Sequence, residues 1–296
     1  MTMDARLPLP WLDRSGRLSL LKLAVFVAAF LPGLYLALAY AADALGPKPL
    51  TALLHGTGEW TVRFLLASLA VTPLRRIANL PSLILVRRML GLTALAYALL
   101  HLGLYVADQN LDLAKVVSEI ALRFYLTIGF VALAGLAALG ATSTDAAIRR
   151  MGPAWNRLHR IVYAIAVLGL LHYFLQSKID VSDPVFWTGL FLLLMGWRLM
   201  HRLGLPTAVL PLLGLALAGG VATALLEAAW YALRNGIPME AVLSANLDFS
   251  GIVRPAWWVL AAGLALPLAR LVRPAPKGRT RSLSRAEPAR RPVAAG

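Results

Sequence analysis

Two histidines lie deep inside apolar stretches of this sequence and are its clearest candidates for chemistry. His101 stands within RRMLGLTALAYALLHLGLYVAD (residues 87–108), and His172 within WNRLHRIVYAIAVLGLLHYFLQSK (residues 155–178). Ionisable side chains inside a membrane helix are costly and are usually functional. Imidazole is a common metal ligand, and two imidazoles can bind one iron from both sides of a porphyrin. The alternative is that each ring separately hydrogen-bonds a helix carbonyl.

The two histidines are predicted to lie at the same depth. His101 follows Arg88 by 13 residues and His172 follows Arg157 by 15 residues. At about 1.5 Å per residue, each ring is about 20 Å or slightly more from the charged end of its helix. We therefore predict that His101 and His172 bind one haem between two transmembrane helices. Such a haem has no open coordination position, so it carries electrons and does not bind oxygen or a substrate.

Three further residues are candidates for cofactor binding. His159 lies near the charged end of the helix that carries His172; it is a candidate for a second haem, a quinone or a flavin, and a solvated interfacial side chain is the alternative. Arg63 and Arg123, at the outer ends of their spans, are candidate contacts for haem propionates, although interface anchoring explains them equally well. His55 and His201 are expected in a loop or at the end of a span, without a role.

The composition predicts a polytopic membrane protein built from helices. Hydrophobic residues make up 59% of the 296 residues and charged residues 15%, whereas soluble domains are nearer to about 45–50% and about 25%. The absence of cysteine excludes disulfides, Cys-ligated iron–sulfur clusters and covalently attached c-type haem. The net charge of +15 is attributed to arginine-rich loops that meet anionic membrane lipid, and nucleic-acid binding is not expected.

Eight apolar segments are candidates for transmembrane helices, because about 20 apolar residues cross a bilayer. Pro32 is expected to kink the first of them. Small residues such as Gly129 and Gly135 let the fourth approach its neighbours closely. The predicted spans are 18–41, 59–74, 89–106, 124–140, 158–175, 185–200, 206–233 and 255–271.

Positive charges are distributed unequally between the two sides of these spans. With the amino terminus inside, seven of the 29 basic residues fall outside: Lys48, Arg63, Lys115, Arg123, Lys178, Arg234 and Arg254. The positive-inside rule therefore predicts that both termini are cytoplasmic. Four parts are expected: a cytoplasmic segment 1–17, a six-span core 18–203, a two-span extension 204–273 and a disordered basic tail 274–296.

Four stretches of the chain closely resemble the MsrQ (YedZ) family, which belongs to the ferric reductase-like transmembrane superfamily. They are TGEWTVRFLLASLAVTPLRR (57–76), RRMLGLTALAYALLH (87–101), RFYLTIGFVALAGLAALGATS (123–143) and WNRLHRIVYAIAVLGLLHYFLQSK (155–178). The resemblance covers about residues 57–183 and extends to the first helix. It implies that the histidines of the family correspond to His101, His159 and His172.

This resemblance also implies a function. MsrQ proteins carry b-type haem, are associated with FMN, and pass electrons from the quinone pool across the bacterial inner membrane. Their acceptor, MsrP, is a periplasmic molybdopterin enzyme that reduces methionine sulfoxide in oxidised proteins, so the catalytic site belongs to the partner. The acidic loop with Asp108, Asp112 and Glu119 would face that partner.

The sequence departs from the family in one respect and leaves other functions open. Family members commonly end soon after the sixth span, whereas two more spans follow Pro206 here. No soluble nucleotide-binding domain is present, which argues against a self-contained NADPH oxidase or ferric reductase. The alternatives are a generic quinone-linked or ferric-reducing cytochrome b, a proton-coupled transporter, and a scaffold with incidental histidines. Against a transporter, inverted repeats are not evident, and Glu227 is the main acidic residue within the spans.

Overall fold

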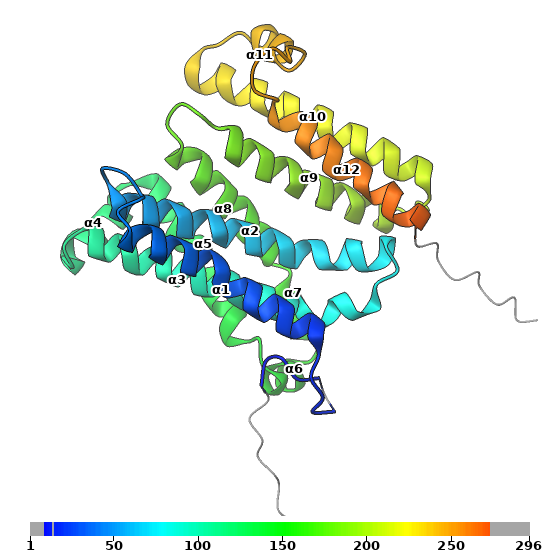
Figure 1. Ribbon diagram of the computed structural model, residues 1–296, viewed down its shortest axis with the longest axis horizontal. Coiled ribbons are helices and arrows are strands. Elements are labelled where there is room, and N and C mark those ends of the chain that lie inside the picture. Colours follow the sequence, from blue (N-terminus) through cyan, green and yellow to red (C-terminus); the bar gives the residue numbers. More distant parts are fainter. Residues whose placement is uncertain (1–8, 14, 273–296) are drawn as a thin grey trace, which may run out of the picture.

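The computed structural model describes residues 9–13 and 15–272, which form an all-helical bundle (Figure 1). The long helices are α1 (Leu20–Ala41), α2 (Pro49–Ile77), α3 (Arg87–Asp108), α5 (Phe124–Ala141), α8 (Val162–Gln176), α9 (Ser182–Arg202), α10 (Val209–Asn235) and α12 (Pro255–Val272). Shorter helices connect them: the 3-10 helix η1 (Pro81–Val86), α4 (Leu113–Leu122), α6 (Asp145–Met151), α7 (Pro153–His159) and α11 (Met239–Ala245). The predicted all-α class is confirmed. The predicted basic tail 274–296, and the start of the predicted segment 1–17, lie outside the described residues.

Six helical segments of the described chain are long and apolar enough to cross a membrane. They are Leu20–Ala41, Pro81–Asp108, Phe124–Ala141, Pro153–Gln176, Val209–Asn235 and Pro255–Val272. The other two predicted spans correspond to α2 and α9, which are 29 and 21 residues long but carry charged side chains such as Glu59 and Arg198. Both helices pack among the others, α2 against α3, α8 and α9, and α9 against α10 and α12. Their polar groups therefore meet protein as well as lipid.

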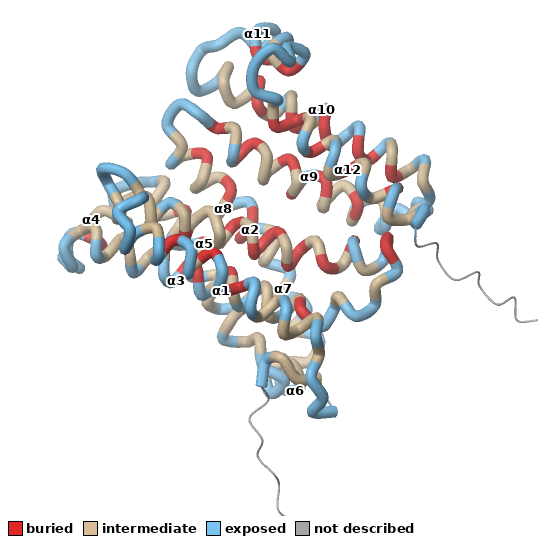
Figure 2. The backbone as a smooth tube through the Cα atoms, in the orientation of Figure 1, coloured by how far each residue is buried: buried red, intermediate tan, exposed pale blue. Residues whose placement is uncertain are grey.

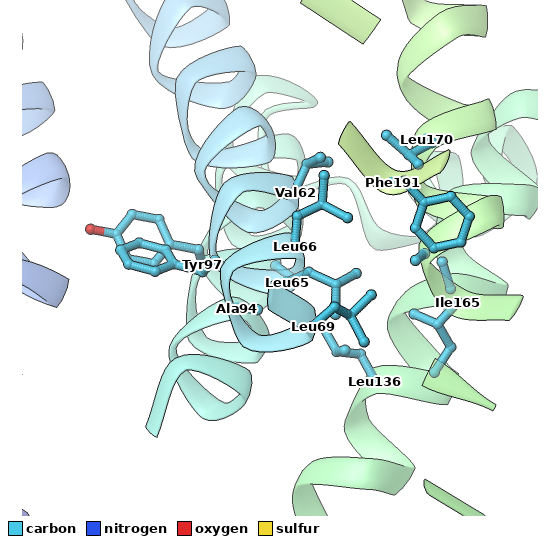
Figure 3. Close-up of a cluster of buried hydrophobic side chains, with 14 of the residues drawn as sticks. Val62, Leu65, Leu66, Leu69, Ala94, Tyr97, Leu136, Ile165, Leu170 and Phe191 are labelled. Atoms are coloured by element: carbon cyan, nitrogen blue, oxygen red, sulfur yellow. The ribbon is translucent and has the colours of Figure 1, made fainter. Parts of the chain in front are cut away.

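The main core lies where α2, α3, α5, α8 and α9 meet. Figure 3 shows leucine and valine side chains of α2 facing aliphatic and aromatic side chains of α5, α8 and α9, whereas Tyr97 of α3 points to the opposite side. By contrast, α1 lies at the edge of the bundle, and only Ala29, Pro32 and Leu36 of its residues are buried (Figure 2). Its exposed leucines and aromatic residues suit contact with lipid, which is as apolar as they are. The buried residues drawn in the close-up include Val62, Leu65, Leu66, Leu69, Ala94, Tyr97, Leu136, Ile165, Leu170 and Phe191.

Two side chains satisfy backbone groups near prolines inside helices. Proline has no N–H, so the carbonyl four residues before it loses its helical partner. In α2, Pro73 frees the carbonyl of Leu69, and Arg198 of α9 donates to that oxygen at 2.6 Å. In α1, the N–H of Gly33, next to Pro32, donates to the Tyr97 hydroxyl at 2.8 Å, and the hydroxyl donates to the Ala29 carbonyl at 2.9 Å. These bonds fasten α9 to α2 and α3 to α1.

Replacing Tyr97 by phenylalanine is expected to lower the free energy of unfolding by about 1–2 kcal/mol. The change keeps the ring but removes the hydroxyl that bridges Gly33 and Ala29, and lipid offers these groups no replacement. Unfolding by SDS in mixed micelles, followed by circular dichroism, measures the loss. Tyr35→Phe is the matched control, because Tyr35 lies on α1, the helix that Tyr97 contacts, but is 68% exposed. Equal losses in the two variants would contradict the bridging role of Tyr97.

Several predicted boundaries are wrong because hydropathy reports contact with lipid and not helicity. The helix α2 begins at Pro49, a residue favoured at the first helical position, so His55 lies inside a helix and not in a loop. The predicted acidic loop contains α4, whose first turn is capped by Asp112, which accepts from the Lys115 N–H at 2.9 Å. Likewise α6, α7 and α11 lie in segments predicted as loops, and the predicted fifth span is interrupted between α7 and α8.

The two long helices beyond α9, α10 and α12, pack closely on it and on each other. A Cβ on Gly263 of α12 would lie 2.8 Å from the Cα of Ala216 in α10, so only glycine permits this approach. Glu227 of α10 is completely buried and forms an ion pair with Arg254 at 3.1 Å. The amide of Asn246, which follows α11, donates to the same carboxylate at 3.1 Å. One buried carboxylate thus joins α10, the end of α11 and the start of α12.

Candidate functional site

The structure brings His101 of α3 and His172 of α8 together. Their ring centres are 6.3 Å apart and the ring planes are almost perpendicular, at 86°. The two histidines come from different helix pairs, since α3 packs mainly on α2 and α8 packs mainly on α5. This proximity is consistent with the prediction, made from spacing along the chain, that the two histidines lie at the same depth.

Each imidazole is oriented by a backbone carbonyl of the neighbouring helix. The Nδ1 of His101 lies 2.8 Å from the carbonyl oxygen of Leu54 in α2, and the Nδ1 of His172 lies 2.8 Å from that of Tyr125 in α5. A carbonyl oxygen only accepts, so in both rings Nδ1 carries the hydrogen and Nε2 has a free lone pair. Both histidines thus form the hydrogen bond to a helix carbonyl that was considered as the alternative to metal ligation. The same bond also fixes the tautomer and the orientation that a metal-binding imidazole requires.

The separation of the rings suits one metal ion between them. Metal–imidazole bonds are about 2 Å long, and ring bonds of about 1.3 Å put the ring centre about 1.1 Å from each nitrogen. Two imidazoles on opposite sides of one metal therefore have centres about 6 Å apart. In the described part of the chain, no group of three or more His, Cys, Asp or Glu residues could hold a metal ion. A metal at this pair must bring its other ligands with it, as iron in a porphyrin does.

Two glycines make room for the imidazoles. A Cβ added to Gly58 of α2 would lie 3.0 Å from Cε1 and Nδ1 of His101. A Cβ added to Gly129 of α5 would lie 2.8 Å from the same two atoms of His172. The His101 ring thus contacts the backbone of α2, and the His172 ring contacts the backbone of α5. In each case this is the helix whose carbonyl accepts the hydrogen bond of the ring. The sequence singled out Gly129 only as a small residue of a packed helix, and Gly58 was not singled out.

Gly129→Ala is expected to disturb the His172 ring. The new methyl group would come closer than real Cβ contacts allow, and the ring cannot turn away without losing its bond to Tyr125. If the pair ligates a cofactor, we expect at least a two-fold loss of that cofactor, measured by absorbance per purified protein. The control is Gly169→Ala on α8, because a Cβ at Gly169 meets no atom within 4 Å. A full cofactor complement in Gly129→Ala would contradict the close fit.

His159, the last residue of α7, lies just before the start of α8 and in a different environment from His172, which lies near the end of α8. Its Nε2 lies 3.1 Å from the Thr142 hydroxyl, and its ring stacks on Trp155 with centres 3.8 Å apart and planes 23° from parallel. The indole N–H of Trp155 donates to the Thr142 carbonyl at 2.8 Å, which fixes the stack. His159 therefore does not join the His101–His172 pair. The spacing of Trp155 and His159, one helical turn apart, was the available signal for this contact.

The two candidate arginines are both engaged in ion pairs. Arg63 binds Glu59 at 2.8 Å, and its guanidinium lies 4.7 Å from the ring centre of Trp60. Arg123 binds Glu119 at 2.5 Å and donates to the Tyr125 hydroxyl at 3.2 Å. Tyr125 is also the residue whose carbonyl orients His172, so Arg123 lies near that end of the site.

Of the two histidines expected to have no role, His201 has identifiable partners in the last turn of α9. Its ring stacks on Trp197 with centres 5.4 Å apart, and its Nε2 contacts the guanidinium of Arg76. His201 thus links α9 to the end of α2. This contact lies in a different part of the bundle from the His101–His172 pair.

Comparisons with known proteins agree on one family. Residues 57–170 match the model of the ferric reductase like transmembrane component family, and this stretch contains His101 and His159. The protein-methionine-sulfoxide reductase heme-binding subunit MsrQ of Azospira oryzae is 41% identical over 192 residues, which are 64% of this chain and 82% of the relative. The subunit MsrQ of Rhodospirillum rubrum is 42% identical over 64% of this chain and 89% of its own length. That of Polaromonas naphthalenivorans is 43% identical over 60% and 83%.

No solved structure matches this chain. The identities exceed 40% over most of each relative's length, and the matched family model includes α3 with His101 and the first part of α8. The chain therefore belongs to the MsrQ family of protein-methionine-sulfoxide reductase heme-binding subunits.

Proposed function

We propose that this protein is the haem-carrying, electron-transferring membrane subunit of a methionine-sulfoxide reductase system. The observation that carries the proposal is the His101–His172 pair, with ring centres 6.3 Å apart and both Nδ1 atoms bound to backbone carbonyls. The printed names of the relatives, which describe a heme-binding subunit, support it. His101 and His172 are the proposed axial ligands of one b-type haem.

The haem would supply a one-electron carrier whose potential depends on ligation, burial and nearby charge. The chain would hold the two imidazoles in one tautomer through the carbonyls of Leu54 and Tyr125. Two imidazole ligands would leave no site for oxygen or substrate, so this subunit would carry electrons and the partner would perform the final reaction. Arg63 and Arg123 are proposed contacts for the haem propionates, because a guanidinium has five donors and each glutamate uses only part of them.

His159 is proposed as part of a second cofactor site, for a quinone, a flavin such as FMN, or a second haem. The planar stack of Trp155 and His159 resembles the surface that a flat aromatic ligand requires. Electrons would enter near His159 from the quinone pool and leave near His101 and His172. The proposed acceptor is an MsrP-like periplasmic molybdopterin reductase that repairs oxidised proteins.

The distribution of charge supports an inner-membrane location with both termini in the cytoplasm. Arginines gather at the end of the bundle with η1, α6 and α7, such as Arg75, Arg88 and Arg149. The end with α4 and α11 would then be periplasmic. We further propose that residues 18–203 are the electron-transfer core and that residues 204–273 are an addition to it.

A dithionite-reduced minus oxidised absorption spectrum of the purified protein, with a pyridine haemochrome assay, tests this function. One b-type haem per chain is expected, and two haems would assign the second to His159. Haem without electron transfer to the methionine-sulfoxide reductase partner would instead favour a generic cytochrome b with another acceptor. A well-folded protein without haem would refute the proposal and favour a proton-coupled transporter.

A further inference from the structure

A large cavity lies at the end of the bundle that carries α11, between the core and the added helices. Its volume is about 810 Å³, which is the size of a typical ligand pocket. Ile179, Asp180 and Asp183, in the segment that leads from α8 into α9, form one wall. Asp248 and Ile252, in the segment from α11 to α12, lie in the other wall. We call it the junction cavity; these two segments lie near one another at the top of Figure 1.

The junction cavity is connected to the helix that carries His172. The next residue, Tyr173, donates its hydroxyl to Oδ2 of Asp183 at 3.3 Å, and Asp183 lines the cavity. The residue after that, Phe174, packs on Trp230 of α10 with ring centres 4.6 Å apart. The end of α8 is thus held between the proposed haem ligand and the cavity wall. A redox partner in the cavity would be near the haem that His172 is proposed to bind.

The cavity is acidic, although the chain as a whole carries a net charge of +15. Asp180 and Asp248 each accept the backbone N–H of the serine two residues later, at 2.9 Å. Hydrogen bonds from Ser182 and Ser250 hold the pKa of each carboxyl below its usual value, so both are ionised at neutral pH. Arg254 also lines the cavity; its guanidinium pairs with the buried Glu227 at 3.1 Å, and its positive charge also lowers the pKa of Asp180. Asp180, Asp183 and Asp248 still outnumber this one cation in the cavity lining.

Exposed apolar side chains border these carboxylates. Ile252 is 90% exposed and Trp258 is 58% exposed, and both line the cavity. Aromatic and aliphatic anchors beside charged groups are typical of protein interfaces, in which charge complementarity guides the encounter. Anionic lipid head groups would be repelled by the aspartates.

We infer that the junction cavity is the docking site for the protein that accepts the electrons. It would receive a segment of that protein with a lysine or arginine for Asp180 and Asp248, and an apolar side chain for Ile252 and Trp258. This inference rests on the proposed function, because it identifies where the reductase partner binds. It also gives the added helices a role, since α11 and α12 supply one side of the surface.

Charge reversal tests the docking site. The full-length protein in nanodiscs is titrated with the purified methionine-sulfoxide reductase subunit of the same organism, at low and moderate salt. Asp180→Lys/Asp248→Lys is expected to weaken binding at least ten-fold and to reduce its salt dependence, with an unchanged haem spectrum. The comparison variant is Asp108→Lys in the acidic loop beside α4, which is the competing surface because the family resemblance implies that this loop faces the partner. If the partner docks at the junction cavity, Asp108→Lys is expected to bind as the unaltered protein does. Weakening by Asp108→Lys alone would place the partner at α4 and overturn the inference.

Photo-crosslinking provides a second measurement that does not depend on charge. A benzophenone amino acid replaces Ile252 in one variant, and Leu113 of α4, which is 63% exposed, in the other. Crosslinks to the reductase from position 252 and not from 113 are expected. Crosslinks from 252 only to lipid or to a second copy of this chain would overturn the docking site while the haem function stands. Absence of haem in the unaltered protein would instead defeat the proposed function, and the docking inference with it.

Discussion

His101→Ala and His172→Ala are each expected to abolish the low-spin haem spectrum. Each change removes one of the two paired imidazoles, and His159 is not available to replace it, because its ring is engaged with Thr142 and Trp155. His159→Ala is expected to retain the haem at the pair. Reduced-minus-oxidised spectra, normalised to protein, measure the result. A normal spectrum from His172→Ala would exclude the proposed pairing.

Two controls separate loss of a ligand from loss of the fold. His201→Ala removes a histidine that stacks on Trp197 in the last turn of α9, and we expect it to leave the spectrum unchanged. Added imidazole is expected to restore part of the spectrum of His101→Ala, because the truncation leaves space beside Gly58. A merely structural role of His101 would give no such rescue.

Glu227→Ala is expected to destabilise the protein by about 3 kcal/mol, at the lower end of the range for breaking a buried ion pair. The carboxylate is completely buried, and its loss leaves Arg254 and the amide of Asn246 without their partner. We expect a loss at the lower end of that range because the Arg254 side chain is 32% exposed, so its charge can still be hydrated after Glu227 is removed. Unfolding by SDS in mixed micelles measures the change.

The control for Glu227 is Glu240→Ala in the first turn of α11, where the carboxylate is exposed. This variant is expected to lose less than about 1 kcal/mol. Glu227→Gln is expected to fall between the two, because its amide oxygen can still accept from Arg254. If Glu227→Ala unfolded like the unaltered protein, the carboxylate would not be the joint between α10, α11 and α12.

The sequence predicted the parts of the fold that depend on contact with lipid. Long apolar segments identified the helices that carry His101 and His172, because a membrane helix must be apolar along most of its length. Helices with a polar or interfacial character were missed. The first two turns of α2 and all of α4 carry histidine, glutamate or lysine. These segments are helical because α2 begins at Pro49 and packs on α3, and because α4 is capped by Asp112 and packs on α5.

The sequence by itself determined the membrane class, the family and the two histidines at matched depth. The membrane class and the matched depth follow from composition and from spacing along one chain, and the family follows from the resemblance of four stretches of the sequence to known members. Only the tertiary structure decided which atoms meet: the carbonyls of Leu54 and Tyr125 on the rings, and Gly129 beneath His172. Such contacts join residues of different helices, and their geometry depends on how closely those helices pack. Packing between helices depends on all the residues along an interface together, so spacing within one helix cannot specify it.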